Sequence, residues 1–321
     1  MDKKFYDVIA LGELLIDFTH NGYSAQGNPI YEANPGGAPC NVLAMLRKLG
    51  KSCVFIGKVG DDIYGHQLKD VLNKVGIPTK YLKMDKDVRT TLAIVQNNES
   101  GDREFSFYRN PGADMMLTVE EIPEEIWENC GIFHFGTLSM THDGVCKATR
   151  KAIALAKKAG CLISFDPNLR PPLWGSLELA KERILEGLGY CDILKIADNE
   201  LEFITGETDF HKGALALKEQ FPNIKLLNVT AGAEGSYSLY QEQWVFVPGF
   251  CLGGTIETTG AGDTFCASVL NFVLENGLDD LSAEQLTQML RFANAAAYLV
   301  TTHKGAICSM PEKEQISILL K

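Results

Sequence analysis

Short apolar runs and longer segments with helical periodicity alternate along most of this sequence, and this alternation limits the possible folds more than any other feature. The apolar runs are rich in Val, Ile and Phe, and they are residues 6–11, 53–57, 131–135, 161–165, 192–196 and 226–230. The helix-like segments are residues 38–49, 64–75, 143–159, 177–188 and 210–219. Buried strands that alternate with helices pair in parallel, with helices on the faces of the sheet. The sequence therefore predicts an α/β protein with a mostly parallel sheet flanked by helices.

Two segments break this alternation. Residues 14–33 and 89–109 are polar and strand-prone, and the second contains a turn signal at residues 97–102 between two alternating runs. We expect these segments to form a small antiparallel sheet, or lid, inserted in a single domain that covers residues 1–321. An antiparallel hairpin is expected over residues 237–246, and helices over residues 263–274, 283–300 and about 311–320.

The segment with the most specific chemistry is Gly260-Ala261-Gly262-Asp263, which opens an apolar helical run. Glycines at a helix start let backbone N–H groups converge on an anion, which the helix dipole also favours. A carboxylate beside a bound phosphate is suited to taking the proton from a hydroxyl that attacks the phosphorus. The alternative interpretation makes Asp263 an ordinary acidic residue of a first helical turn.

Other candidate residues lie at strand ends and helix starts. Gly36 and Gly37 precede a helix whose first turn contains Asn41, and Asp17 follows the first strand. Close backbone approach and a carboxylate at a strand end suit a polyol, although a plain loop before a helix is an equal alternative for the glycines. Lys195 ends a strand, Arg109 and Arg170 lie in loops, and residues 230–235 follow another strand. Each cation either neutralises phosphate or is an ordinary surface charge.

Composition excludes several classes of protein. The 321 residues are 45% hydrophobic and 22% charged, which suits a globular core, and no apolar stretch approaches the ~20 residues of a membrane span. With no secretory signal either, we expect a cytoplasmic protein. Nine cysteines without a Cys-x-x-Cys pair indicate buried thiols, not a disulfide framework. A net charge of −11 argues against nucleic acid or membrane partners, so an anionic ligand would need local donors and Mg²⁺.

Two groups of motifs resemble the signatures of the ribokinase-like, or pfkB, family of carbohydrate kinases. The first group is Gly36-Gly37 with Asn41, Leu49-Gly50, and residues 57–62 (GKVGDD) with Gly65; the second is residues 258–263 (TTGAGD). The similarity covers nearly the whole chain. Residues 10–18, 107–114 and 165–174 are most similar to the fructokinases of this family.

This resemblance implies a doubly wound α/β domain with a β-sheet lid, a sugar bound between them, and a homodimer formed through the lid. It implies ATP and Mg²⁺ as cofactors, a small-molecule sugar as substrate, and phosphorylation of D-fructose at a primary hydroxyl. The residues expected to hold or border the sugar are Asp17, Gly36, Gly37, Asn41, Arg109 and Arg170. Those expected to bind ATP are Lys195, Thr230, Gly232, Gly235, Gly260, Gly262 and Asn294. Asp263 would be the general base, and Gly260, Ala261 and Gly262 the anion hole.

The metal positions contain two departures from the family pattern. Glu200 matches a glutamate that acts indirectly on Mg²⁺, but Ala197 stands where relatives usually have Asn or Ser. Glu257, with Thr259, marks the candidate K⁺ site, where relatives usually have Asp in place of Glu257. The alternatives to a fructokinase are a 2-keto-3-deoxygluconate kinase, and a catalytically inactive sugar-binding or regulatory protein with the same fold.

Overall fold

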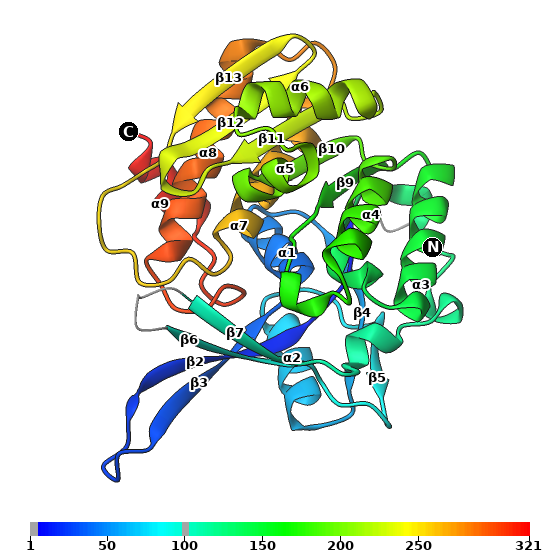
Figure 1. Ribbon diagram of the computed structural model, residues 1–321, viewed down its shortest axis with the longest axis vertical. Helices are drawn as coiled ribbons and strands as arrows, with labels where there is room; N and C mark the ends of the chain where they lie inside the picture. The colour runs from blue at the N-terminus through cyan, green and yellow to red at the C-terminus, as the bar shows by residue number, and fades with distance from the viewer. Residues whose placement is uncertain (1–5, 98–102) are drawn as a thin grey trace.

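A computed structural model describes residues 6–97 and 103–321. Within these residues, one sheet has nine strands (Figure 1). In spatial order they are β13 (Gln243–Pro248), β12 (Gly235–Tyr240), β11 (Leu226–Thr230), β10 (Ile193–Ala197), β9 (Leu162–Asp166), β8 (Cys130–Gly136), β1 (Tyr6–Leu11), β4 (Cys53–Gly60) and β5 (Leu82–Asp85). Every pair from β5 to β11 is parallel, and the hairpin β12–β13 adds two antiparallel strands at one edge. The predicted α/β class and the predicted edge hairpin are confirmed.

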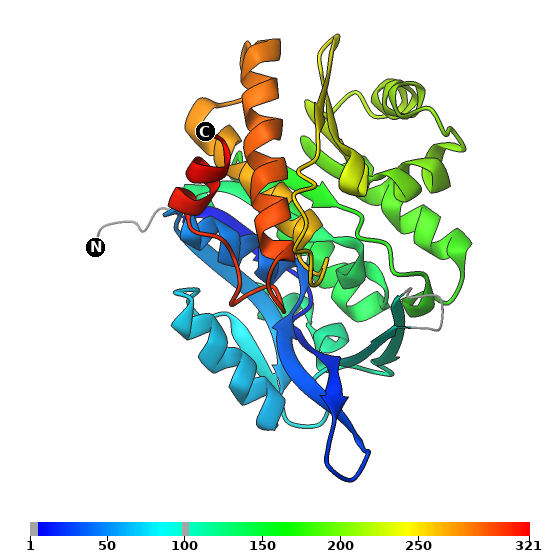
Figure 2. The ribbon, with the colours of Figure 1, turned by 90° about the vertical axis from the view of Figure 1, so that its left-hand side faces the viewer.

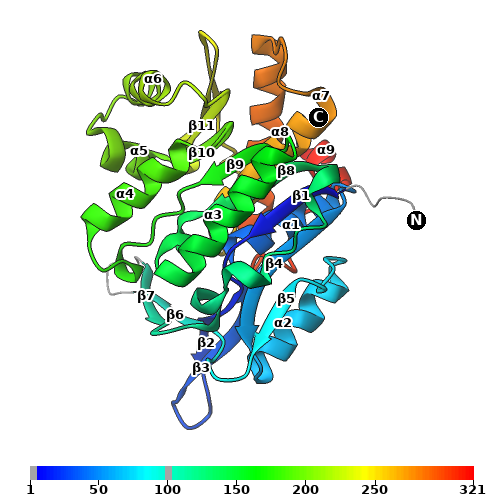
Figure 3. The ribbon, with the colours of Figure 1, turned by 90° about the vertical axis from the view of Figure 1, so that its right-hand side faces the viewer.

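Helices cover both faces of this sheet (Figures 2 and 3). One face packs against α1 (Ala38–Lys48), α2 (Ile63–Lys74), α7 (Ala261–Asn276), α8 (Ala283–Thr301) and α9 (Lys313–Leu319). The other packs against α3 (Asp143–Lys158), α4 (Leu177–Leu188), α5 (Asp198–Thr205) and α6 (Phe210–Gln220). Each face has its own buried apolar cluster, which is why the central strands are apolar on both sides. None of the helices within residues 6–97 and 103–321 combines the length and the apolar character that crossing a bilayer requires.

The second sheet, called the lid sheet here, contains β2 (Leu15–Tyr23), β3 (Pro29–Gly36), β6 (Leu92–Asn97) and β7 (Arg103–Tyr108). It projects from the body below the carboxyl ends of the parallel strands (Figure 1). The prediction that it is antiparallel is wrong in one respect. The hairpins β2–β3 and β6–β7 are antiparallel, but β2 and β6 join them in parallel. The predicted turn at residues 97–102 lies almost wholly outside the described residues, and Asn97 pairs with Arg103 across it.

One strand and one α-helix were not anticipated from the sequence, namely the four-residue strand β5 and the eight-residue helix α5. Helix α5 follows β10 without an intervening loop and ends at Gly206, which adopts a left-handed conformation with φ of 75°. Helix α7 begins at Ala261, two residues before the predicted start. Gly260 is therefore the N-cap residue, and the whole Gly260–Asp263 motif lies at the helix start.

Candidate active site

A cavity of about 550 Å³ lies between the lid sheet and the carboxyl ends of the parallel strands. In parallel α/β sheets, ligands usually bind at this edge. The predicted site residues that line the cavity are Asp17, Gly37, Asn41, Arg170, Lys195, Glu200, Thr230, Gly232, Thr259, Gly260, Gly262 and Asp263. The structure therefore brings the expected sugar-binding, catalytic and nucleotide-binding residues together around one space.

Asp263 lies in the first turn of α7 and contacts Asn41 from the first turn of α1. The Asn41 Nδ2 donates a hydrogen bond of 2.7 Å to Asp263 Oδ2 across 222 residues of sequence. This amide is rigidly placed, since Asn41 is buried and its helix packs extensively against α7. Asn41 was expected to hold sugar hydroxyls, and the structure gives it a second role, because its amide fixes the orientation of the expected base.

The pKa of the Asp263 carboxyl is raised to about 6, chiefly because burial disfavours the charged form. The hydrogen bond from Asn41 opposes this rise in pKa most strongly. The Asp166 carboxylate raises the pKa further, while Lys195 and Arg170 lower it. A carboxyl with a pKa of about 6 is ionised at neutral pH yet binds a proton more readily than an ordinary aspartate, which suits a general base.

The start of α7 is shaped to hold an anion. Gly260 has φ of 81°, and a Cβ on it would lie 2.6 Å from the Ala306 Cβ, so only glycine fits there. The 16-residue helix directs the positive end of its dipole toward the cavity, which Gly260 and Gly262 line, while the Ala261 N–H donates to the Thr258 carbonyl at 3.3 Å. This geometry fits the expected anion hole.

The expected sugar side is equally close-packed. A Cβ on Gly36 would lie 2.5 Å from Asp17 Oδ2, and one on Gly37, which has φ of 128°, would lie 2.4 Å from the Glu13 carbonyl oxygen. Because neither residue has a side chain, the backbone at the end of β3 can pack directly against Asp17 of β2 and against the Glu13 carbonyl group. The Asp17 carboxylate therefore borders the cavity beside the Gly36–Gly37 backbone.

Glu13 is a buried carboxyl at the same edge, and it was not expected to be part of the site. Its Oε1 accepts a hydrogen bond of 2.8 Å from the Ala38 N–H at the start of α1, where the N-cap Gly37 offers no side chain. Burial raises the pKa of Glu13 to about 7, although hydrogen bonds from its own and the Ala38 N–H groups limit the rise. Glu13 thus anchors the helix that carries Asn41.

Lys195 was expected to end a strand, but it lies in the middle of β10, which continues to Ala197. It forms a buried ion pair with Asp166 at the end of β9, with Nζ–Oδ distances of 3.1 and 3.2 Å. Burial alone would lower the pKa of the Lys195 ammonium. The carboxylates of Asp166 and Glu200 outweigh that effect and raise this pKa well above its ordinary value. The ammonium therefore stays charged beside the cavity.

Glu200, in the first turn of α5, is the residue expected to influence Mg²⁺. Its carboxylate accepts hydrogen bonds from the N–H groups of Leu169 (2.6 Å) and Ala197 (2.9 Å), and burial raises its pKa. Ala197 thus interacts with Glu200 through its backbone, although it lacks the polar side chain of relatives. No cluster of three metal-ligating side chains occurs within the described residues. The Glu200 carboxylate at the cavity fits Mg²⁺ that is held mainly by phosphate oxygens and water.

Glu257, at the candidate K⁺ site, uses both carboxylate oxygens internally. Oε1 accepts from the Thr259 hydroxyl at 2.5 Å, and Oε2 accepts from the Gly305 N–H at 3.2 Å. These bonds tie the segment before α7 to the segment after α8.

The remaining expected residues do not line the cavity. The Arg109 guanidinium is buried against Asp114 (Nη2–Oδ2 2.6 Å) and also donates to the Thr141 hydroxyl and the Leu138 carbonyl. The Asn294 amide binds Ser236 and the carbonyl groups of residues 247 and 248. Gly235 packs in the β12–β13 hairpin, where a Cβ would lie 2.2 Å from the Val247 carbonyl oxygen. Gly36, Ala261 and Glu257 do not line the cavity either, although each is adjacent in sequence to a residue that does.

Comparison with known proteins decides the family. The model of the pfkB family carbohydrate kinases matches residues 6–313. This chain belongs to that family. It is 40% identical to a probable fructokinase-2 of Arabidopsis thaliana over 315 residues, which are 97% of this chain and 95% of the relative.

Solved structures of bacterial fructokinases have the same fold as this pfkB kinase. The Xylella fastidiosa fructokinase with bound ATP has a TM-score of 0.89 at 29% identity, and the match covers 98% of each chain. A double mutant of the Vibrio cholerae O395 fructokinase, with fructose, ADP and a potassium ion bound, has a TM-score of 0.88 at 28% identity and covers 100% of both chains. The expected ribokinase-like fold is confirmed.

Two residues of this kinase site escaped the sequence-based assignment of roles, Glu13 and Asp166. Each lies at the carboxyl end of a buried strand or just beyond it, which was the available signal. Acidic residues occur at many strand ends, so position alone does not distinguish them. Only the structure shows that Glu13 contacts α1 and that Asp166 contacts Lys195.

Proposed function

We propose that this protein is an ATP-dependent fructokinase, which converts D-fructose and ATP to fructose 6-phosphate and ADP. The observation that carries the proposal is the Asp263 carboxylate, oriented by Asn41 at the anion-binding start of α7, inside a cavity that also contains the Lys195 ammonium. The similarity to fructokinases over almost the full length of this chain supports fructose as the sugar.

In this proposal, Asp263 accepts the proton of the attacking primary hydroxyl. The hydroxyl oxygen forms a bond to the γ-phosphorus as the bond from that phosphorus to the β,γ-bridging oxygen breaks, and ADP leaves. The N–H groups of residues 260–262 and the Lys195 ammonium stabilise the negative charge on the transferring group. Bound Mg²⁺ would neutralise phosphate oxygens, and Glu200, which lines the cavity, would help to hold it there. Asp17, Asn41 and the Gly37 backbone would orient the sugar.

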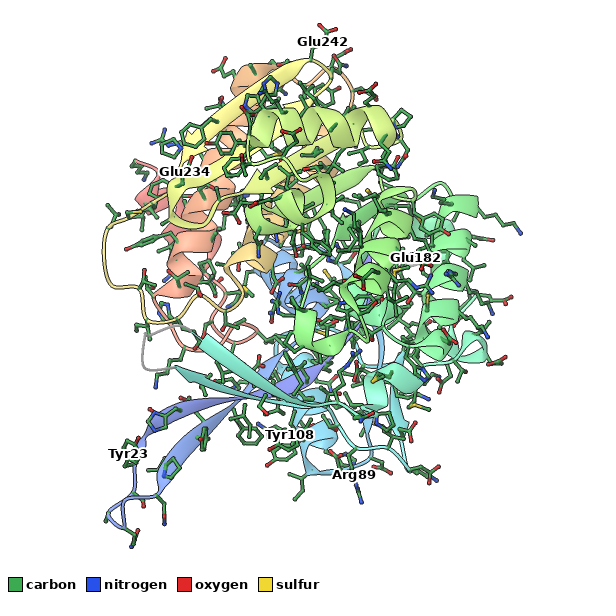
Figure 4. The ribbon with its side chains drawn as sticks, in the orientation of Figure 1. Tyr23, Arg89, Tyr108, Glu182, Glu234 and Glu242 are labelled. Atoms are coloured by element: carbon green, nitrogen blue, oxygen red, sulfur yellow. The ribbon has the colours of Figure 1, made fainter. Side chains whose placement is uncertain are left out.

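The lid sheet would cover the sugar and exclude water, which otherwise competes as phosphoryl acceptor. A homodimer formed through the lid remains a prediction, as does a cytoplasmic location. Tyr23 at the tip of the β2–β3 hairpin and Tyr108 at the end of β7 support the dimer, because their side chains are 69% and 61% exposed (Figure 4). Exposed aromatic residues on a projecting sheet are typical of contact surfaces.

The alternative 2-keto-3-deoxygluconate kinase receives no support. That activity would use Arg109 and Arg170 to bind a sugar carboxylate. Arg170 lines the cavity, but the Arg109 guanidinium is held by Asp114 outside the cavity lining. An inactive sugar-binding protein is disfavoured as well, because Asp263 and the glycines expected to bind the anion are present, and Gly260, Gly262 and Asp263 line the cavity.

The test is ADP release measured in a coupled assay with fructose, glucose, ribose and 2-keto-3-deoxygluconate, with and without Mg²⁺. We expect Mg²⁺-dependent turnover with fructose as the preferred sugar. Asp263→Asn should lower kcat by ~10²-fold or more without loss of folding, because the base is removed. Preference for another sugar would refute the fructokinase assignment, and near-normal turnover of Asp263→Asn would refute the role of Asp263.

A further inference from the structure

Asp166 and Lys195 form a buried ion pair between the neighbouring strands β9 and β10. Asp166 is 2% exposed and Lys195 is 7% exposed. Both carboxylate oxygens of Asp166 lie within 3.2 Å of Lys195 Nζ. Breaking such a pair by removing one partner is costly, because it leaves an uncompensated charge in a region of low dielectric constant.

The two partners occupy different positions relative to the cavity. Lys195 lines the large cavity, and its Nζ would lie 3.2 Å from a Cβ placed on Gly262, so the ammonium stands directly beside the first turn of α7. Asp166 does not line that cavity and lies behind Lys195, next to His134. The carboxylate therefore contacts the lysine and not the space for ligands.

The other groups around Asp166 bring no positive charge. Burial lowers the pKa of His134 to about 4, so the imidazole is neutral at pH 7, and its Nδ1 is hydrogen-bonded to the Ser164 hydroxyl at 2.9 Å. The Asn168 N–H donates to Asp166 Oδ1 at 3.2 Å. Among the described residues, Oδ2 of Asp166 has no hydrogen-bond partner apart from its ion pair with Lys195. The Asp166 charge is thus compensated by Lys195.

We propose that Asp166 is a positioning residue for phosphoryl transfer, which holds the Lys195 ammonium beside the anion-binding start of α7. This inference rests on the proposed function. A lysine side chain has four rotatable carbon–carbon bonds and takes up many conformations unless something fixes it. Asp166 fixes it beside the first turn of α7 and within electrostatic reach of the Asp263 carboxylate, where an incoming phosphate would lie. Stabilisation of the transferring group requires charge that is already in place.

The test compares kcat and KM for ATP and fructose in the wild type and in Asp166→Asn. We expect a ~10- to 100-fold lower kcat with a small change in the KM for fructose, because the asparagine no longer holds the ammonium in place. The matched control is Asp192→Asn, at the residue that immediately precedes β10. Asp192 pairs with Lys225 at 3.1 Å and does not line the cavity, so this variant should keep the wild-type kcat.

A double-mutant cycle with Lys195→Met distinguishes positioning from a general loss of structure. If Asp166 acts through Lys195, the Asp166→Asn change should have almost no effect on kcat in the Lys195→Met background. That double variant also removes both charges together, so it remains testable if Asp166→Asn alone fails to fold. Additive effects of the two substitutions would overturn the inference.

The pH profile provides a readout that a purely structural role would leave unchanged. Asp166 raises the pKa of Asp263 and Lys195 lowers it. The acid limb of kcat/KM should therefore move to lower pH in Asp166→Asn and to higher pH in Lys195→Met. Shifts in the same direction would contradict the inference. A wild type that is inactive with every sugar would refute the proposed function instead, so the two failures are distinguishable.

Discussion

The hydrogen bond from Asn41 to Asp263 leads to a quantitative prediction for the variant Asn41→Leu. Leucine has a similar size but cannot donate, so the Asp263 carboxylate loses the contact that most opposes the rise of its pKa. A hydrogen bond to a charged group contributes ~1.5–3 kcal/mol, and ~1.4 kcal/mol corresponds to one pH unit. The pKa of Asp263, about 6 in the wild type, should therefore rise to between ~7 and ~8.

The expected role of Asp263 as the base decides whether activity rises or falls with pH. Asp263 accepts a proton only when it is ionised, so activity falls as the pH falls through its pKa. At pH 7 the ionised fraction should decrease from ~90% in the wild type to between ~10% and ~50% in Asn41→Leu.

The assay is kcat/KM for fructose between pH 5 and pH 9, since this ratio reports the pKa of the free enzyme. Asn199→Ala is the matched control, because Asn199 also lines the cavity but is not a hydrogen-bond partner of Asp263. Its acid limb should coincide with that of the wild type. An unchanged acid limb in Asn41→Leu would refute the argument that Asn41 keeps Asp263 ionised.

Three further predictions concern Glu13, Gly260 and the candidate K⁺ site. The pKa of Glu13 is about 7 in the folded protein and 4.5 ordinarily, so its contribution to stability is complete below pH 4.5 and is lost as the pH rises through 7. Relative to the wild type, Glu13→Gln should gain on the order of 3 kcal/mol of unfolding free energy between pH 4 and pH 8, measured by urea denaturation; equal pH dependence of both proteins would contradict this. Gly260→Ala should lose ~2–4 kcal/mol of unfolding free energy and most activity, because strain at positive φ adds to overpacking. The control is Gly253→Ala, because Gly253 has φ of 80° but a Cβ there would have no heavy atom within 4 Å, so this variant should show the cost of backbone strain alone. Equal losses of unfolding free energy in the two variants would exclude the contact with Ala306 as a cause. Because both Glu257 oxygens are engaged, replacing K⁺ by tetramethylammonium should change kcat little, and strong activation by K⁺ would refute this reasoning.

Periodicity and turn chemistry predicted most of the main sheet correctly. The buried strands and long amphipathic helices carry strong periodic signals, so they were found with small errors at their ends. Strand β5 and helix α5 were missed because four and eight residues are too short for a distinct period. The parallel contact between β2 and β6 was also missed, because two hairpins far apart in sequence contain no local signal for how they pair.

Within the site, the local sequence predicted a residue's role best where all the residues needed for that role are adjacent. The Gly260–Asp263 motif combines an anion-binding helix start with a carboxylate, and both properties follow from neighbouring residues. Arg109, Gly235 and Asn294 show the limit of this approach. Their residue types suit ligand binding, but the groups that they contact come from other elements, and these contacts hold them outside the cavity lining.

The sequence by itself determined the α/β architecture, the glycine-rich start of α7 and the position of the expected base, because each depends on periodicity or on adjacent residues. Tertiary structure alone decided what sets the properties of that base. The Asn41 amide comes from 222 residues away, Asp166 meets Lys195 only because β9 and β10 pair in parallel, and Glu13 reaches α1 from the end of β1. Burial and distance determine a pKa and the direction of a charged group, and neither exists until the chain has folded.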